Sequence, residues 1–144
     1  MGKDTELGSM LETPRACLIA RDLAKHVSFI AFGTNDLTQA TFGMGRDDAH
    51  NWLSAYKRLE PTSLSVDPFR SLDRNGVGAL MRLAILEARS VRENLHVYLC
   101  GEHAADTATI GFAQEIGANG VSCGPSLVPA ARLSAGKAAA AMAR

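Results

Sequence analysis

The sequence lacks the features that mark several classes of protein. Its three cysteines include no Cys-x-x-Cys pair, so neither a zinc site nor a disulfide framework is indicated, and we expect reduced thiols. Lys and Arg number 15, as do Asp and Glu, and this balance argues against a nucleic-acid or acidic-membrane partner. Apolar runs stay below roughly 18 residues and no charged-then-apolar leader is seen. The sequence therefore predicts a cytoplasmic protein without a membrane span.

The chain does contain an alternation of strand and helix, repeated four times. Alternating units of this kind predict an α/β fold with a parallel sheet. The expected strands lie near 8–12, 28–33, 95–100 and 120–123. The expected helical stretches lie near 15–26, from after 33 to about 92, near 106–117 and near 127–143.

The second predicted strand ends in the most informative stretch, residues 29–39, where an apolar run breaks at Gly33 into small polar groups. This pattern is typical of a buried parallel strand that leads into a loop for an anion and a metal. Gly33 allows a ligand to approach the backbone, and Thr34 and Asn35 offer donors. Asp36 can ligate a hard cation such as Mg²⁺. The stretch predicts a phosphate-bearing substrate.

Two other strand ends carry functional groups. Glu12 ends the first predicted strand, and Cys100 ends the third before a Gly-Glu turn. In (β/α) barrels, catalytic residues lie at the carboxyl ends of several strands. Glu12, Asp36 and Cys100 fit that placement, and two carboxylates on neighbouring strand ends repel each other unless a cation or proton lies between them.

Apolar periodicity predicts which faces are buried. In the third strand, alternation separates Leu95, Val97 and Leu99 from His96, Tyr98 and Cys100, and the first set is expected under the helices. Asp73 is a candidate N-cap for the longest helix. The apolar stripe of that helix consists of Val77, Leu80, Met81, Ala84, Ile85 and Ala88.

Each site residue also has a structural interpretation. Glu12 is compatible with a solvated carboxylate or a pair with Arg15, and Asp36 with an N-cap for a helix starting at Leu37. Free cysteine often fills a core, so Cys100 is compatible with simple packing. These alternatives stay open from the residues alone.

The order of these motifs resembles the C-terminal phosphoenolpyruvate/pyruvate-binding domain of pyruvate, phosphate dikinases, within the phosphoenolpyruvate-utilising enzymes. Sugar phosphotransferase enzyme I shares the motif from Gly33 to Gln39, but three other elements resemble the dikinase branch: the Arg-Asp-Asp, the Asp-Pro-Phe, and the His that follows Cys-Gly-Glu. The matching elements are residues 10–16, 32–39, 41–43, 46–48, 67–69, 72–73, 76–78, 100–103 and 121–123.

The resemblance implies a fold and its extent. It identifies residues 1–144 as a partial domain, the C-terminal half, about four βα units, of a phosphoenolpyruvate-binding TIM (β/α)8 barrel. A whole barrel takes roughly 250 residues, and this chain has 144. The first barrel half, its substrate-clamping arginines and a phosphohistidine domain are expected in cis or in trans.

The resemblance also implies a reaction and its residues. The full enzyme converts ATP, pyruvate and phosphate to AMP, phosphoenolpyruvate and diphosphate, and this domain passes the phosphoryl group between phosphohistidine and pyruvate. Glu12 and Asp36 would hold Mg²⁺, and both, with Gly33, Thr34 and Asn35, would bind the substrate. The family's proton-donor cysteine matches Cys100.

Other motif residues have weaker assignments. Cys17 is expected to pack within the first helix, and Cys123 to lie at the end of the fourth strand. Glu102 and His103 either orient the thiol or are exposed loop residues. Residues 46–48 are expected to form a solvated charge cluster or ion pairs within the domain.

Two positions depart from the family pattern. Ala104-Ala105 stands where the dikinases typically have two glycines, and Gly124 where they typically have serine. Added methyl groups restrict φ in a tight turn. The departures leave room for a displacement of the loop that carries Glu102.

Half a barrel leaves two functional hypotheses. The first is a phosphotransferase domain that is inactive without the other half; the second is a non-catalytic half-barrel that binds ligand or assists assembly. Either would leave the inner sheet face bare, so we expect a homodimer. The residues predicted on that face are Met10, Phe29, Ala31, Tyr98 and Val121.

Overall fold

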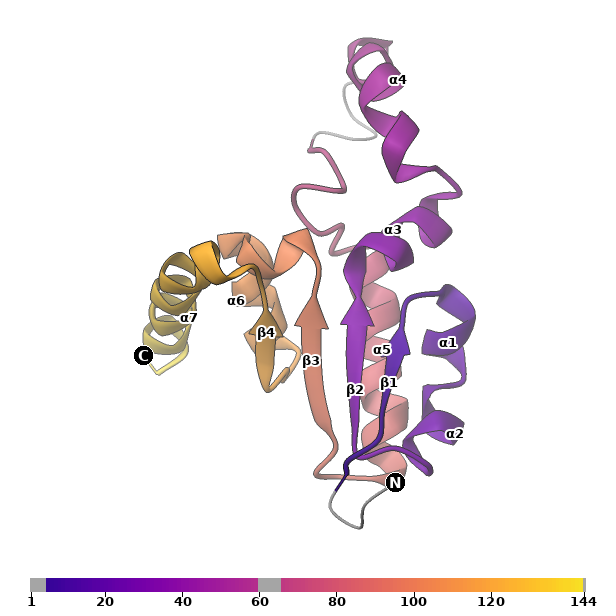
Figure 1. Cartoon of the computed structure of the whole chain (residues 1–144), viewed down its shortest axis with the longest axis vertical. Helices are drawn as coiled ribbons and strands as arrows, with labels where there is room; N and C mark the ends of the chain where they lie inside the picture. The colour runs from indigo at the N-terminus through magenta and orange to yellow at the C-terminus, as the bar shows by residue number, and fades with distance from the viewer. Residues whose placement is uncertain (1–4, 60–65, 144) are drawn as a thin grey trace.

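The computed structural model describes residues 5–59 and 66–143, and within them one parallel sheet forms the centre of the molecule. The spatial order β1-β2-β3-β4 equals the chain order, and helices connect successive strands (Figure 1). The fold class is therefore confirmed as α/β, consistent with the C-terminal half of a phosphoenolpyruvate-binding barrel. The strands are β1 (Gly8–Leu11), β2 (Phe29–Gly33), β3 (His96–Cys100) and β4 (Gly120–Ser122).

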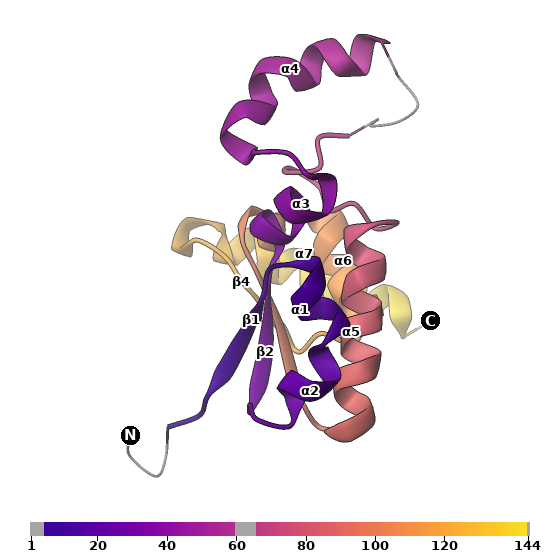
Figure 2. The same ribbon diagram turned by 90° about the vertical axis from the view of Figure 1, so that its right-hand side faces the viewer.

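The helices lie along the sheet or at its carboxyl edge. Figure 2 shows α1, α2 and α5 on one side of β1 and β2, whereas α4 extends beyond the carboxyl edge. The α-helices are α1 (Pro14–Leu18), α2 (Ala20–Ala24), α3 (Thr34–Phe42), α4 (Arg46–Leu59), α5 (Val77–Val91), α6 (Thr107–Glu115) and α7 (Val128–Met142). Two 3₁₀ turns are η1 (Glu102–Ala105) and η2 (Pro125–Leu127).

The first helical stretch differs from the single helix expected near 15–26. It is divided at Ile19, whose ψ of 16° lies far from the helical value of about −42°. Thr13 caps α1 because its hydroxyl accepts a hydrogen bond from the Ala16 N–H at 3.1 Å. Both short helices still bury small residues against the sheet, including Cys17 and Ala20.

The core lies between the sheet and its helices. Leu11, Phe32 and Leu99 are completely buried on the helical side. The predicted alternation of β3 is confirmed, since Val97 is also buried whereas Tyr98 is only half-buried.

Val121 lies on the other face from the one predicted. It pairs with Leu99 in the register of β3 and β4 and packs against the helical core. A three-residue strand gives too little alternation to define its face, and a shift of one residue reverses every side chain. Val121 therefore does not belong to the inner face.

Asp73 binds the backbone before α5, although that helix begins later than the capping prediction implied. Its carboxylate accepts hydrogen bonds from Asn75 N–H at 3.1 Å, Gly76 N–H at 3.0 Å and Val77 N–H at 3.3 Å. The predicted apolar stripe is confirmed, because all its members are buried except Leu80, which is half-buried.

The opposite face of the sheet has no helix over it among the described residues (Figure 2). Met10 on this face is 47% exposed, and Phe29 packs edge-on against Tyr98 with ring centroids 6.0 Å apart. This uncovered sheet face carries side chains that line the interior in a closed barrel. Within the described ranges, no helix combines the length and apolarity needed to cross a membrane.

Candidate active site at the carboxyl edge of the sheet

The parallel register aligns three predicted site residues in one row. Leu11 pairs with Phe32, so Glu12 follows at the level of Gly33, and Gly33 pairs with Cys100. Side chains two residues apart point to the same face of a strand. Glu12, Gly33 and Cys100 therefore share the uncovered sheet face at its carboxyl edge.

Gly33, in the middle of this row, makes room for the Glu12 side chain. A Cβ atom there would lie 2.9 Å from Glu12 Oε2 and 3.4 Å from Met10 Cγ. Any side chain at this position would thus displace the Glu12 carboxylate. A glycine is required here because the Glu12 side chain approaches the backbone closely, and the sequence motif had indicated a close approach at this position.

Glu12 and Asp36 line the same cleft, although they are 24 positions apart in the sequence. The cleft has a volume of about 500 Å³ and lies between the end of β1 and the helix α3. Its other lining residues are Thr13, Gln39, Ala40, Gly43, Met44 and Gly45. The tertiary structure thus brings the two predicted metal-binding carboxylates to one opening.

Asp36 is not the N-cap of α3. The helix already begins at Thr34, so Asp36 lies in its first turn, exposed, where its Oδ1 accepts a hydrogen bond from Gln39 Nε2 at 3.2 Å. No side chain caps α3. The N–H groups of its first turn are available to an anion, and the helix dipole favours negative charge there.

The Thr34 side chain forms hydrogen bonds within the protein. Its hydroxyl is completely buried and lies 2.8 Å from the carbonyl oxygen of Cys100, to which it donates, and 2.8 Å from His103 Nδ1. Only the backbone of Thr34 is therefore free for a ligand, contrary to the expectation that its side chain offers a donor.

Asn35 presents a polar atom without a hydrogen-bond partner among the described residues. Its Oδ1 is buried, and it lies 3.3 Å from the position that a Cβ of Gly101 would occupy. The oxygen and nitrogen of an amide exchange places when the side chain flips, so either atom can occupy this buried position. Such a group costs free energy unless a ligand or water satisfies it.

Cys100 ends β3 with its thiol directed toward β2. The Sγ atom donates a weak hydrogen bond to the Phe32 carbonyl at 3.3 Å and lies 3.8 Å from Met10 Sδ. Partial burial raises the pKa of this thiol, and the nearby Glu12 and Asp36 carboxylates raise it further. The thiol therefore keeps its proton at neutral pH.

The other cysteines lie elsewhere. Cys17 is completely buried in α1, as predicted, and burial raises its pKa to about 11. Cys123 lines a separate pocket beside α7, together with Val121 and Val128. Of the three thiols, only that of Cys100 is in the row with Glu12.

Glu102 and Arg46 form an ion pair across the carboxyl edge, with the Glu102 side chain 62% exposed. The pair fits the predicted intradomain bridge for residues 46–48. Ala104 is completely buried in η1, and no described residue other than glycine has a positive φ. The two alanines thus adopt ordinary backbone conformations in this loop.

The residues present fit a magnesium ion that the protein would coordinate only in part. No group of three His, Cys, Asp or Glu side chains converges anywhere in residues 5–59 and 66–143. Mg²⁺ typically keeps several waters and is bound by one or two carboxylates together with substrate oxygens. Glu12 and Asp36, which line one cleft, would supply those two carboxylates.

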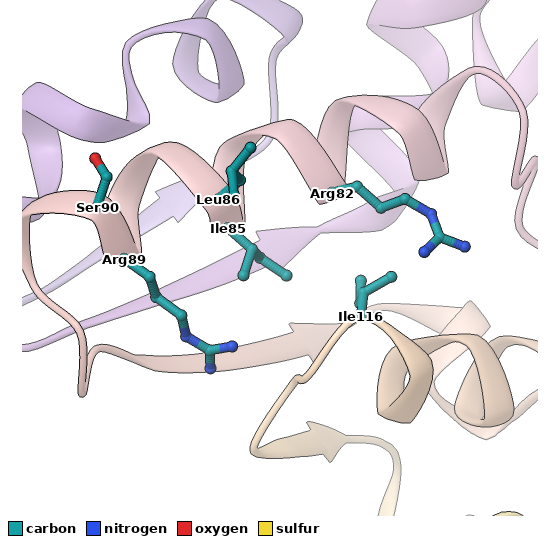
Figure 3. A pocket seen from close by; sticks show the side chains of 6 residues that line it. All are labelled: Arg82, Ile85, Leu86, Arg89, Ser90 and Ile116. Carbon is teal, nitrogen blue, oxygen red and sulfur yellow. The ribbon is translucent and has the colours of Figure 1, made fainter. Parts of the chain in front are cut away.

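A larger pocket of about 630 Å³ lies on the helical side, between α5 and the end of α6 (Figure 3). Its two arginines already have partners within the protein: Arg82 pairs with Glu115 at 2.6 Å, and Arg89 donates to the Gly117 carbonyl at 2.8 Å. Leu86 and Ile85 make its wall apolar. No carboxylate lines it, and the hydroxyl of its one serine, Ser90, donates to the Glu87 carbonyl at 2.6 Å, so it is not the candidate active site.

The contacts of two residues at the site were not predicted from the sequence. Met10 contacts the Cys100 thiol. Because Met10 lies two residues before Glu12 on the same strand, alternation places both side chains on one face and would have indicated this contact. His103 is completely buried, so it is not an exposed loop residue. Its Nε2 donates to the Pro68 carbonyl at 2.7 Å, a long-range contact with no local sequence signal.

Comparison with known proteins gives the family. Residues 1–140 match the model of the PEP-utilising enzyme, PEP-binding domain. The chain is 48% identical over 136 residues to pyruvate, phosphate dikinase of Giardia intestinalis, covering 94% of this chain and 15% of that protein. It is 48% identical over 130 residues to pyruvate, phosphate dikinase 1, chloroplastic, of Arabidopsis thaliana, covering 90% and 13%.

A bacterial relative gives the same result. Pyruvate, phosphate dikinase of Clostridium symbiosum is 45% identical over 133 residues, which are 92% of this chain and 15% of that protein. The chain thus spans about one seventh of the length of these relatives. The motif order, the half-barrel sheet and the match over 140 residues agree: the chain belongs to the PEP-binding domain family of the PEP-utilising enzymes.

Proposed function

We propose that this chain binds phosphoenolpyruvate or pyruvate together with Mg²⁺ at the carboxyl edge of the sheet, as the pyruvate-binding part of a dikinase-like phosphotransferase. The observation that carries the proposal is the row formed by Glu12, Gly33 and Cys100, with Asp36 in the adjoining cleft. It brings carboxylates, a glycine that Glu12 approaches closely and a protonated thiol to one edge of the sheet.

Glu12 and Asp36 would hold the cation. Mg²⁺, when bound, would polarise the oxygens of the substrate and offset the charge that develops as pyruvate becomes an enolate. The N–H groups at the start of α3 would receive the carboxylate or phosphate, since no side chain caps them. The Asn35 amide would donate to the substrate if flipped, which would satisfy an otherwise unpartnered group.

Cys100 would exchange a proton with the terminal carbon. When phosphoenolpyruvate is consumed, the P–O bond breaks as the phosphoryl group passes to a histidine outside this chain, which leaves an enolate. The Cys100 S–H then donates its proton to the methylene carbon, which gives the methyl group of pyruvate and a thiolate. The raised pKa of the thiol supports this direction, because the proton is present at neutral pH.

The remaining groups for the reaction would come from outside residues 1–144. In the family that the chain resembles, the substrate-clamping arginines and the phosphohistidine belong to segments outside residues 1–144. They would stabilise the charge of the transferring phosphoryl group. We therefore expect ligand binding but no phosphoryl transfer from this chain by itself.

Calorimetric titration with oxalate, a mimic of the enolate, tests the proposal. We expect binding in the presence of excess Mg²⁺ and none in excess chelator, because the two carboxylates would repel an unneutralised dianion. Absence of binding under both conditions would contradict the proposal and favour the non-catalytic hypothesis of an assembly module. Equal affinity under both conditions would contradict the role of Mg²⁺.

A further inference from the structure

The His103 side chain links three segments beneath the candidate active site. It is completely buried in η1, with Nδ1 2.8 Å from Thr34 Oγ1 and Nε2 2.7 Å from the Pro68 carbonyl oxygen. Thr34 begins α3, and Pro68 lies in the loop before α5. The imidazole thus fixes the loop, the helix start and the end of β3 relative to one another.

The hydrogen-bond partners determine which atoms of this network carry a proton. A carbonyl only accepts, so Nε2 must carry a hydrogen toward Pro68. Burial lowers the pKa of His103, so the ring is neutral at pH 7 and its Nδ1 is an acceptor. The Thr34 hydroxyl has a single hydrogen and two acceptors at 2.8 Å, so it shares that hydrogen between the Cys100 carbonyl and His103 Nδ1. Thr34 Oγ1 is held between them.

The backbone after Cys100 packs directly on that hydroxyl. Gly101 has a φ of 96°, and a Cβ on it would lie 2.9 Å from Thr34 Oγ1. The Cys100 thiol itself donates a hydrogen bond to the Phe32 carbonyl of β2. The Thr34 hydroxyl thus contacts the backbone of both Cys100 and Gly101, and His103 is the side chain that lies against this hydroxyl.

We propose that His103 is a positioning residue for Cys100: by holding the Thr34 hydroxyl against the Cys100 carbonyl, it fixes the thiol beside Gly33. The inference rests on the proposed function only for the identity of Cys100 as the group that transfers the proton. The positional claim itself concerns contacts within this chain. It therefore has a test that needs neither substrate nor metal.

Two variants separate the two hydrogen bonds of the ring. The amide of Asn in place of His103 reaches the position of Nδ1 and keeps a partner for Thr34, whereas the amide of Gln reaches Nε2 and keeps the donor to Pro68. Both remove the aromatic ring from the same buried site. A residue that only packs would respond alike to His103→Asn and His103→Gln.

The measurement is the rate of alkylation by iodoacetamide, followed at each cysteine by peptide mass spectrometry in the whole chain. Cys123 is the internal reference, and the buried Cys17 reports unfolding. Loss of one hydrogen bond predicts that His103→Gln raises the Cys100-to-Cys123 rate ratio about fivefold, while His103→Asn leaves it within about twofold. Equal effects of the two variants, or none, would overturn the proposal.

A second variant decides the matter if His103→Gln unfolds the chain and exposes Cys17. Thr34→Val removes the same hydroxyl with little change in shape, and we expect it to raise the Cys100 ratio about fivefold as well. An unchanged ratio would overturn the proposal. Oxalate titration of the unaltered chain reports the proposed function separately, because its failure would leave the alkylation result unaffected.

Discussion

Gly33 and Cys100 face each other across the parallel pairing of β2 and β3. Because Gly33 has no side chain, the Glu12 carboxylate approaches its backbone from β1 while the thiol lies on the other side, bonded to the Phe32 carbonyl. A carboxylate and a proton donor thus lie on either side of the Gly33 backbone. We propose that the three-carbon substrate binds next to this row, at the cleft that Glu12 and Asp36 line.

Asp36→Asn should weaken Mg²⁺-dependent oxalate binding about tenfold or more, because the amide removes one of two anionic ligands of the cation. Calorimetry in excess Mg²⁺ measures the affinity. Asp47→Asn is a matched control, since Asp47 is exposed in the first turn of α4 and does not line the cleft. An affinity equal to that of the control would exclude Asp36 as a ligand.

Cys100→Ala should slow the exchange of pyruvate methyl protons with solvent about a hundredfold in a complete protein that contains this domain, because the group that transfers the proton is lost. Cys123→Ala should largely spare the exchange, since Cys123 lines a different pocket. Nuclear magnetic resonance in deuterated water follows the methyl signal. Retained exchange in the Cys100 variant would assign the transfer to another residue.

Gly101→Ala should destabilise the chain by about 2 kcal/mol, because the φ of 96° is strained for an L residue and the added methyl meets Thr34. Gly124→Ala makes the same chemical change at a φ of −57° with open space around it, and it should alter stability by less than about 0.5 kcal/mol. Urea unfolding measures both. Similar losses in the two variants would refute the strain at Gly101.

Stability should fall as the pH drops below about 6.5, because burial holds the pKa of His103 below its ordinary value. The unfolded chain then binds a proton that the folded chain resists, so this contribution is complete above the unfolded pKa and decreases below it. Nearby Asp106 and Glu102 favour the charged ring, and Arg46 opposes it. Unfolding midpoints at pH values on both sides of 6.5 measure the change.

His103→Gln provides the control for this pH dependence, because the amide does not titrate. The variant should be less stable than the parent at neutral pH and should lose less stability on acidification. An identical pH slope in both proteins would assign the effect to other groups.

The uncovered sheet face should drive self-association, because apolar side chains there have no cover among the described residues and β1 and β4 are unpaired edges. Light scattering behind size exclusion should give at least a dimer at micromolar concentration. Met10→Glu on this face should weaken association, whereas Leu86→Glu, on the helical side and 68% exposed, should not. A monomer of 15.3 kDa would contradict the prediction.

Much of the fold was predictable because it depends on local patterns. Strand positions follow from short apolar runs, and the buried face of α5 follows from helical spacing. The division of the first helix at Ile19 could not be predicted from the sequence, since it results from one non-helical backbone angle within an otherwise helical pattern. The face of Val121 also did not follow, because it depends on pairing with a distant strand.

The site was predictable in its residue types but not in its geometry. Glu12, Asp36 and Cys100 stand out because each follows an apolar run. The use of the Thr34 hydroxyl inside the protein depends on His103, 69 positions away. Sequence patterns within one element cannot indicate such a contact.

The sequence by itself determined the family, the order of the βα units and the chemical groups at each strand end, because these depend on residue identity and on period. Only the tertiary structure decided that the register brings Glu12, Gly33 and Cys100 into one row, and that His103 is buried rather than exposed. The reason is physical: hydrogen bonding between strands fixes register, and packing fixes burial, and both join residues that are distant in the chain.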